Sequence, residues 1–204
     1  MKKYIPILLI VLFSSLQVVL AQKDSSIFKI PKQISVEFGY RNSFYTHTYL
    51  TNTATPQGLP NMATHGYGGL IDYAWQLSGF GGKRPAAFIS VPMGYSVLLP
   101  DDATSRKVSM LNYGWTVRHD LAKASCKIVP FVGYGLFLNR LYLDGVQGSV
   151  AGHQTQFEGG VNFNTSTRLK YFVKLQCSYS SYSQLTNPKS LHFMYADMRV
   201  GVRF

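Results

Sequence analysis

The sequence predicts an all-β protein whose chain forms an eight-stranded antiparallel up-and-down transmembrane β-barrel. Apolar and polar residues alternate along eight stretches, which is the period of a strand with two different faces. Charged residues make up only 14% of the chain and aromatic residues another 14%, whereas a typical soluble domain has about 25% charged residues. Eight strands of about ten residues are the dimensions of the smallest membrane barrels.

The first residues have the layout of a secretory signal peptide. Lys2 and Lys3 precede an apolar run from Ile5 to Phe13, and small residues precede Gln22, as a signal-peptidase site requires. Polar residues interrupt the run before it reaches the ~20 apolar residues of a spanning helix, which favours cleavage over a membrane anchor. The predicted parts of the chain are a signal peptide at 1–21, a short periplasmic N-terminal segment at 22–32 and the barrel at 33–204.

Charge and cysteine content narrow the classes of partner. Removing Lys2 and Lys3 from the formal net charge of +11 leaves +9. A basic balance can indicate nucleic acid, but export argues against it, so we expect anionic outer-membrane lipid or lipopolysaccharide phosphate as the counter-charge. The chain has two cysteines, Cys126 and Cys177. They fall on non-adjacent predicted strands at different heights, so we expect free thiols.

The first four stretches alternate regularly. In each, every second residue is apolar and the residues between are mostly polar or glycine. In order, they are KQISVEFGYRNSF from Lys32, HGYGGLIDYAWQL from His65, AAFISVPMGYSVL from Ala86 and SMLNYGWTVRH from Ser109. Each is therefore interpreted as a strand with one apolar face.

The last four stretches include the one irregular member of the set. KIVPFVGYGLFLNRL from Lys127 is apolar on both faces, so alternation does not say which face turns outward. The other three are QFEGGVNFN from Gln156, RLKYFVKLQCSYS from Arg168 and YADMRVGVRF from Tyr195. Because an open sheet edge in lipid leaves backbone groups unpaired, we expect the last strand to close the barrel against the first.

The polar faces predict a lumen of paired ions. Alternation alone does not say which face is outside, because a soluble lipocalin-like barrel alternates too. The polar faces carry acids and bases in nearly equal numbers and share several glycines, which suits a narrow interior. The predicted lumen ion network contains Glu37, Asp72, Arg118, Glu158, Lys174, Asp197 and Arg199. An eight-stranded barrel is just wide enough for side chains to fill, so no diffusion pore is expected.

Aromatic residues on the apolar faces are predicted to form two belts. Trp75, Trp115, Phe163, Tyr171 and Phe204 come near the periplasmic strand ends, and Tyr40, Tyr67, Tyr95, Phe157 and Tyr179 near the opposite ends. Two belts suit the two interfaces of a bilayer. The connections at 46–64 and 142–154 are long, so they are expected to face outward, and the loop at 46–64 is a candidate contact for an extracellular ligand.

The short Thr165–Thr167 connection predicts how the sixth and seventh strands pair. Pairing about its central serine places Glu158 opposite Lys174, with both side chains on the polar face. We expect a Glu158–Lys174 contact, joined by Arg199 or Arg118 from across the lumen, because an unpaired charge in a closed interior costs several kcal/mol.

The C-terminal stretch YADMRVGVRF, ending in Phe204, resembles the signature by which the assembly machinery recognises outer-membrane β-barrel proteins. The stretches LAQ and PFVGYGLFLNR resemble small outer-membrane barrels of the Bacteroidetes type. The resemblance implies an outer-membrane location in a Gram-negative cell, with the N- and C-termini periplasmic. It also implies that Phe204 acts as an assembly signal and that the barrel assembly machinery is a partner.

The stretch YSSYSQLTNP, from Tyr179, resembles the active-site segment of lipid A 3-O-deacylases, which are also eight-stranded barrels. The matching residues are Ser181, Leu185, Asn187 and Pro188. Tyr179 stands where that family has its histidine base, and Tyr182 where it has an asparagine. A serine without its base is a weak nucleophile, so the resemblance implies a barrel that has lost this activity.

No catalytic, cofactor-binding or metal-binding residues are predicted, because no spacing typical of such sites occurs. The predicted function is therefore non-enzymatic. We expect a structural or surface-binding role, adhesion included, for a barrel with a side-chain-filled lumen. The alternatives are a deacylase-like outer-membrane hydrolase, or a small transport or assembly component of the outer membrane.

Overall fold

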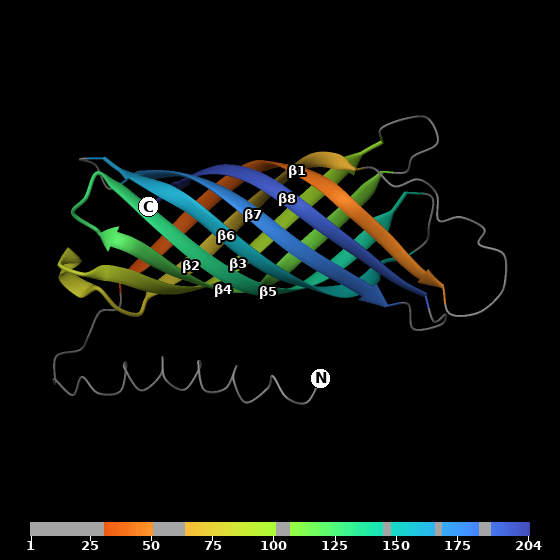
Figure 1. The fold of residues 1–204 in the computed structure, drawn as a ribbon, viewed down its shortest axis with the longest axis horizontal. Coiled ribbons are helices and arrows are strands. Elements are labelled where there is room, and N and C mark those ends of the chain that lie inside the picture. The colour runs from red at the N-terminus through yellow and green to blue at the C-terminus, as the bar shows by residue number, and fades with distance from the viewer. Residues whose placement is uncertain (1–30, 51–63, 101–106, 145–147, 166–168, 184–188) are drawn as a thin grey trace, which may run out of the picture. The chain divides into compact units, whose positions relative to one another are not determined.

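The computed structural model describes residues 31–50, 64–100, 107–144, 148–165, 169–183 and 189–204. Lys32–Phe204 form one compact unit, which is the coloured ribbon of Figure 1. The predicted signal peptide and most of the predicted N-terminal segment lie outside the described residues. The first strand begins at Lys32, one residue before the predicted barrel boundary.

The unit is a closed barrel in which each strand pairs antiparallel with the next in the chain and the last pairs with the first (Figure 1). The strands are β1 (Lys32–Leu50), β2 (His65–Gln76), β3 (Pro85–Leu99), β4 (Val108–Lys123), β5 (Ile128–Leu143), β6 (Val150–Asn164), β7 (Lys170–Ser183) and β8 (Lys189–Arg203). A 3-10 helix, η1 (Phe80–Gly82), lies between β2 and β3. The predicted fold class, an all-β eight-stranded antiparallel up-and-down barrel, is confirmed.

The strands are longer than the predicted ten residues, which corrects the predicted loops. β1 continues to Leu50, so the first part of the predicted loop 46–64 is strand, and residues 51–63 lie outside the described residues. β5 and β6 likewise shorten the predicted loop 142–154 to the span between Leu143 and Val150. Trp115 and Phe157, both predicted near strand ends, lie in the middle of β4 and β6.

The barrel has two different ends. We call the end where β1 begins and β8 finishes the terminus end, and the opposite one the loop end. The β2–β3 connection at the terminus end reverses through Gly79, whose φ is 75°. A Cβ on Gly79 would lie 2.5 Å from the Pro85 carbonyl oxygen. Only glycine therefore fits this turn, because it tolerates both the left-handed backbone and the close approach.

β1 and β8 close the barrel. They pair from Ser35 opposite Arg203 to the last residue of β1. Beyond that pair, the Phe204 N–H donates to the Ile34 carbonyl oxygen at 2.9 Å. Closure satisfies the backbone groups that an edge strand would leave open. Among the described residues, no helix has the length and apolar character needed to cross a bilayer.

Burial in the barrel is inverted relative to a water-soluble protein. On the outer face, Phe157 is 69% and Leu175 64% exposed, whereas the inward-facing Glu37 is 4% and Arg41 1% exposed. The alternating faces therefore turn apolar side chains outward and polar ones into the lumen. This direction is the one predicted from the sequence.

Inward-facing glycines make room for the largest side chains in the lumen. A Cβ on Gly201 would lie 2.4 Å from Cζ of Phe172, and one on Gly39 would lie 2.4 Å from Cγ of Arg199. Each large side chain lies over a glycine directly opposite it on the neighbouring strand. The glycines on the polar faces thus set the packing of the interior, because a filled core has no space for the extra atoms.

Candidate functional site: the ion-paired lumen

The seven predicted network residues all face the lumen, but they form separate groups rather than one network. The order of the groups follows from the inward residues of β7 and β8. From the terminus end to the loop end these are Lys170, Phe172, Lys174, Gln176, Ser178, Ser180 and Tyr182 on β7, and Arg203, Gly201, Arg199, Asp197, Tyr195 and Phe193 on β8. Charged side chains lie toward the terminus end and the middle, with Phe172 among them, and Tyr182, Tyr195 and Phe193 lie toward the loop end.

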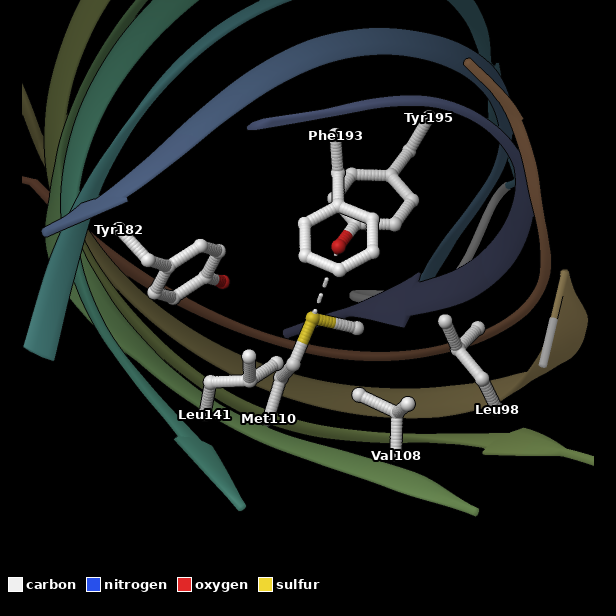
Figure 2. Close-up of a cluster of buried hydrophobic side chains, with 7 residues drawn as sticks. All are labelled: Leu98, Val108, Met110, Leu141, Tyr182, Phe193 and Tyr195. Atoms are coloured by element: carbon white, nitrogen blue, oxygen red, sulfur yellow. Dashed lines mark hydrogen bonds between the residues drawn. The ribbon is translucent and has the colours of Figure 1, made fainter. Parts of the chain in front are cut away.

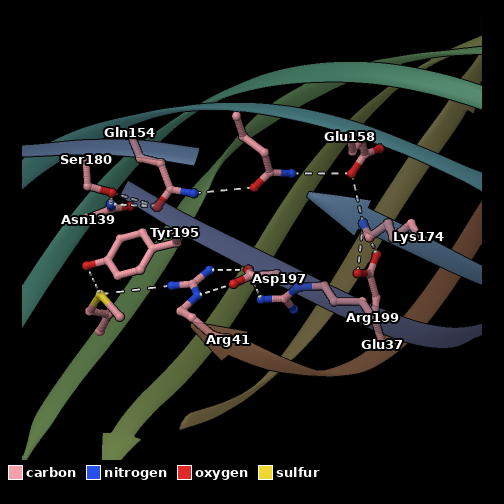
Figure 3. Close-up of polar contacts among 12 residues, drawn as sticks. Glu37, Arg41, Asn139, Gln154, Glu158, Lys174, Ser180, Tyr195, Asp197 and Arg199 are labelled. Carbon is pink, nitrogen blue, oxygen red and sulfur yellow. Dashed lines mark hydrogen bonds and ion pairs between the residues drawn. The ribbon is translucent and has the colours of Figure 1, made fainter. Parts of the chain in front are cut away.

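Lys174 lies between two carboxylates (Figure 3). Its Nζ is 2.9 Å from Glu158 Oε2 and 2.8 Å from Glu37 Oε2. The expected Glu158–Lys174 contact is present, but the expected register is wrong, because Glu158 lies opposite Gln176. The shift is two residues, which keeps every side chain on its face, so Lys174 reaches Glu158 diagonally. Residues 166–168 of the connection lie outside the described residues.

Arg41, Asp197 and Arg199 form the second group (Figure 3). Arg41 donates to Asp197 through Nε and Nη2 at 2.8 and 2.7 Å, and Arg199 Nη2 donates to Asp197 Oδ2 at 3.1 Å. Arg199 was expected to join the Glu158–Lys174 contact. It lies directly opposite Lys174, but its guanidinium pairs with Asp197 instead. Arg41 is missing from the predicted network, although it shares the polar face of Glu37. Its partner depends on the β1–β8 register, which alternation does not give.

Arg118 forms the third group, near the terminus end. Its Nε lies 3.6 Å from Asp120 Oδ1, its Nη2 donates to Gln33 Oε1 at 3.2 Å, and its guanidinium lies over the Phe88 ring. It therefore does not join Lys174, as had been the alternative expectation. Asp72 has no ion pair within 4 Å among the described residues, and its Oδ1 is buried without a hydrogen-bond partner.

A small cavity separates the Lys174 group from Arg118. Its lining includes Asp72, Glu158 and Arg203. The cavity has room for about one water molecule. Side chains therefore occupy the middle of the lumen and leave no open channel there.

Uncharged groups follow toward the loop end. Asn139 Nδ2 donates to Gln154 Oε1 at 3.0 Å and to Ser180 Oγ at 3.3 Å (Figure 3). Gln154 in turn donates to Gln156, and Gln156 to Glu158, both at 3.3 Å. This chain of amides links the uncharged layer to the Lys174 group, so the polar interior is connected along β6.

An apolar cluster closes the lumen beyond the amides. Figure 2 shows its members, Leu98, Val108, Met110, Leu141, Tyr182, Phe193 and Tyr195, each of which is fully buried. The rings of Phe193 and Tyr195 stack with centroids 5.5 Å apart, and Tyr195 Oη donates to Met110 Sδ at 3.2 Å. The lumen is therefore not polar throughout. At this end, apolar or aromatic side chains point inward from β3, β4, β5, β7 and β8.

The segment that resembles deacylases lies partly on the outer face. Ser181 is directly opposite His192 of β8 on one side and His153 of β6 on the other. Tyr179 Oη lies 2.6 Å from His192 Nδ1, and their rings stack. The sequence does not indicate this contact, because strand pairing is not visible in it. Residues 184–188, which contain the rest of the resemblance, lie outside the described residues.

Other candidate groups are isolated. Among the described residues, no cluster of three or more His, Cys, Asp or Glu side chains is arranged to hold a metal ion. Cys126 and Cys177 are free and exposed. Phe204, the predicted assembly signal, is 58% exposed at the end of the closing strand.

Fold and interior together define a closed eight-stranded barrel filled by its own side chains. No protein-family model matches the chain, and no curated protein matches it. Among solved structures, Neisserial surface protein A (NspA) is similar, with a TM-score of 0.59 and 11% identity over 84% of this chain and 95% of that one.

The outer membrane protein OprG from Pseudomonas aeruginosa is similar with a TM-score of 0.53 and 8% identity, over 86% of this chain and 97% of that one. The outer membrane enzyme PagL gives a TM-score of 0.47 and 14% identity, over 82% of this chain and 97% of that one. At these identities the likeness concerns the barrel fold and does not extend to an activity.

Proposed function

We propose that the protein is a non-enzymatic outer-membrane β-barrel with a structural or surface-binding role, whose filled lumen does not conduct. The inverted burial carries the proposal. An exposed apolar band around the whole barrel is costly in water and favourable in lipid. Buried ion pairs and the apolar cluster take up the space through which a solute would pass.

The orientation and partners extend this proposal. The terminus end faces the periplasm and the loop end faces the outside, where the connection between β1 and β2, which is the remaining part of the predicted loop 46–64, contacts an extracellular ligand. Outer-membrane lipid and lipopolysaccharide surround the band, and the assembly machinery recognises the strand that ends in Phe204. The signal peptide at 1–21 and the Bacteroidetes-type stretches of the sequence support export to this membrane.

The two natural cysteines test the membrane placement. Cys177 lies on the outer face of β7, opposite Phe157 of β6, and Cys126 lies in the β4–β5 connection at the terminus end. In lipid nanodiscs, a charged maleimide should label Cys126 and spare Cys177, while a lipid-soluble maleimide labels Cys177. Both cysteines should react in denaturant. Equal reaction of both with the charged reagent in nanodiscs would rule out a bilayer around β7.

Conductance tests the filled lumen. Purified protein added to a planar bilayer should insert without steps of ion current. The apolar cluster supplies the physical reason, because seven fully buried side chains at the loop end exclude water from that part of the lumen. Regular current steps would show that the lumen opens, and would favour the alternative function of a small transport protein.

A lipid hydrolase is the second candidate, and one observation favours it. Ser181 and His192 are cross-strand neighbours on the outer face, and Tyr179 lies within hydrogen-bond distance of His192 Nδ1. A triad needs a nucleophile, a base and a group that orients the base, and Tyr179 is placed for the last role. An acidic orienting group is absent from these contacts.

Acyl release separates the two candidates. If the hydrolase candidate is correct, purified protein releases fatty acid from lipopolysaccharide, a fluorophosphonate labels Ser181, and Ser181→Ala and His192→Ala abolish both signals. Thr155→Ala, on the neighbouring strand β6, is the control and should keep them. No release and no labelling would leave the non-enzymatic proposal standing.

A further inference from the structure

Three cations gather at the terminus end of the lumen, and only one of them has a carboxylate within 4 Å among the described residues. Lys170 of β7 and Arg203 of β8 lie directly opposite each other, and both face inward. Arg118 of β4 is nearby and has Asp120 at 3.6 Å. Among the described residues, neither Lys170 nor Arg203 forms an ion pair within 4 Å.

Aromatic rings and one amide hold the cations in place. The amide is that of Asn162, whose Oδ1 accepts a hydrogen bond from Arg203 Nη1 at 2.6 Å. Arg203 lies over the Phe172 ring at 4.6 Å, and Arg118 and Arg203 lie 5.6 and 5.8 Å from the centroid of the Phe131 ring. Such contacts attract a cation but do not cancel its charge. This cluster differs in that respect from Lys174, which has two carboxylates within 3 Å.

The arrangement leaves positive charge without a partner. Like charges directly opposite each other on neighbouring strands are destabilising, and the cost rises where the groups are buried. Arg203 is buried, and Lys170 is partly buried. The next carboxylate along this row is Asp72, which is separated from Arg203 by Ser35 of β1.

An unused hydrogen-bond donor lies at the same place. The Oγ of Ser35, which is 2% exposed, has no hydrogen-bond partner and lies opposite Arg203. The buried Nε of Arg118 has no hydrogen bond either, but Asp120 lies 3.6 Å from it in an ion pair. Buried donors normally have an acceptor, so the Ser35 hydroxyl points to an acceptor that the chain itself does not supply.

The outer rim of this end adds to the positive field. Five side chains there are exposed cations: Lys32, Lys83, Arg84, Lys123 and Lys127. A surface of one sign raises the local concentration of counter-ions, so anions are attracted to the opening.

We propose that the terminus end of the lumen binds a small oxyanion, such as inorganic phosphate or sulfate. Lys170, Arg203 and Arg118 supply its positive charge, and the Ser35 hydroxyl donates a further hydrogen bond. The anion neutralises the opposed cations and thereby stabilises the closing strands. The site does not depend on the proposed membrane role, because it lies inside the barrel.

Anion titration of the refolded, detergent-solubilised protein tests the site. The urea midpoint of unfolding should rise with phosphate or sulfate to a plateau, and should rise less with chloride at the same ionic strength. Phosphorus NMR of inorganic phosphate gives the dissociation constant directly. Lys170→Gln should raise this constant about tenfold or more, as expected for loss of a charged hydrogen bond.

Lys123→Gln is the matched control, because it removes the same charge from the outer rim at the same end. It should bind phosphate as the wild type does. General salting-out by sulfate stabilises any folded protein, so equal gains in wild type and Lys170→Gln would overturn the proposal. An equal loss of phosphate affinity in Lys123→Gln and Lys170→Gln would also overturn the proposal, because it would show general electrostatic attraction to this end and no specific site. Lys170→Gln should fold, because Lys170 is only partly buried. The comparison of Lys170→Gln with Lys123→Gln therefore tests the anion site even if a variant of the buried Arg203 does not fold.

Discussion

Arg41 and Asp197 face each other across the seam between the first and last strands and share two hydrogen bonds. The pair is bidentate, with Nε–Oδ1 at 2.8 Å and Nη2–Oδ2 at 2.7 Å, and both side chains are buried. Bidentate geometry fixes the relative position of the two strands as well as neutralising their charges. The lumen thus contributes to the register of the seam.

Asp197→Asn should destabilise the barrel by about 3–5 kcal/mol, because it leaves Arg41 charged and poorly paired in a closed interior. Urea unfolding in detergent measures the change. Replacing both residues, Arg41→Met with Asp197→Leu, should recover part of the loss. A change under about 0.5 kcal/mol, typical of a surface position, would show that water reaches the pair.

The Lys174 group predicts an order of effects. Lys174→Met leaves Glu37 and Glu158 facing each other without a cation, so it should cost more than Glu158→Gln, which leaves Lys174 paired with Glu37. We expect about 3–5 kcal/mol for the first and a smaller loss for the second. Unfolding free energies of the two variants give the order, and the reverse order would mean that Glu37 does not neutralise Lys174.

Adjacent glycines of β6 provide a matched pair. A Cβ on Gly160 would lie 2.4 Å from the Val173 carbonyl oxygen and 2.7 Å from Phe131 Cζ, whereas one on Gly159 would meet nothing closer than 3.9 Å. Gly160→Ala should therefore destabilise by about 1–3 kcal/mol. Gly159→Ala should be neutral or slightly stabilising. Similar thermal midpoints for both variants would contradict the close packing inside.

Phe204 predicts an assembly defect. Its N–H bonds to Ile34 at 2.9 Å, and its ring is exposed on the outside. Deleting Phe204 should lower the amount of protein in the outer membrane far more than Phe204→Tyr, because the deletion removes both the aromatic ring and the last backbone pairing. Membrane fractions from cells expressing each variant give the comparison. Equal amounts of the deletion variant and the wild type in the outer membrane would show that Phe204 is not an assembly signal.

The sequence allowed us to predict which side chains face the lumen, but not which of them form ion pairs with one another. A period of two fixes which side chains share a face, so Glu37, Glu158 and Lys174 were placed inside together. Register depends on turn geometry and on long-range pairing, which explains the two-residue error at β6–β7. It also explains why Arg41 was not assigned to Asp197.

The aromatic part of the interior was missed for a different reason. The sequence of β5 is apolar on both faces. This was the one indication in the sequence that Phe131 and Phe137 lie inside the lumen. Similarly, His192 lies eleven residues beyond Ser181 in the chain, so only strand pairing brings it opposite Ser181. Sequence proximity carries no information about such cross-strand neighbours.

The seam between β1 and β8 also constrains the order of folding. Ser35 and Arg203 are partners although nearly the whole barrel separates them in the chain. Contacts this distant in sequence make folding slow, because loop-closure entropy is lost before the contacts form. Until β8 is available, β1 has an unpaired edge that other chains can extend. A chain that ends before β8 therefore keeps the edge of β1 unpaired and open to pairing with other chains.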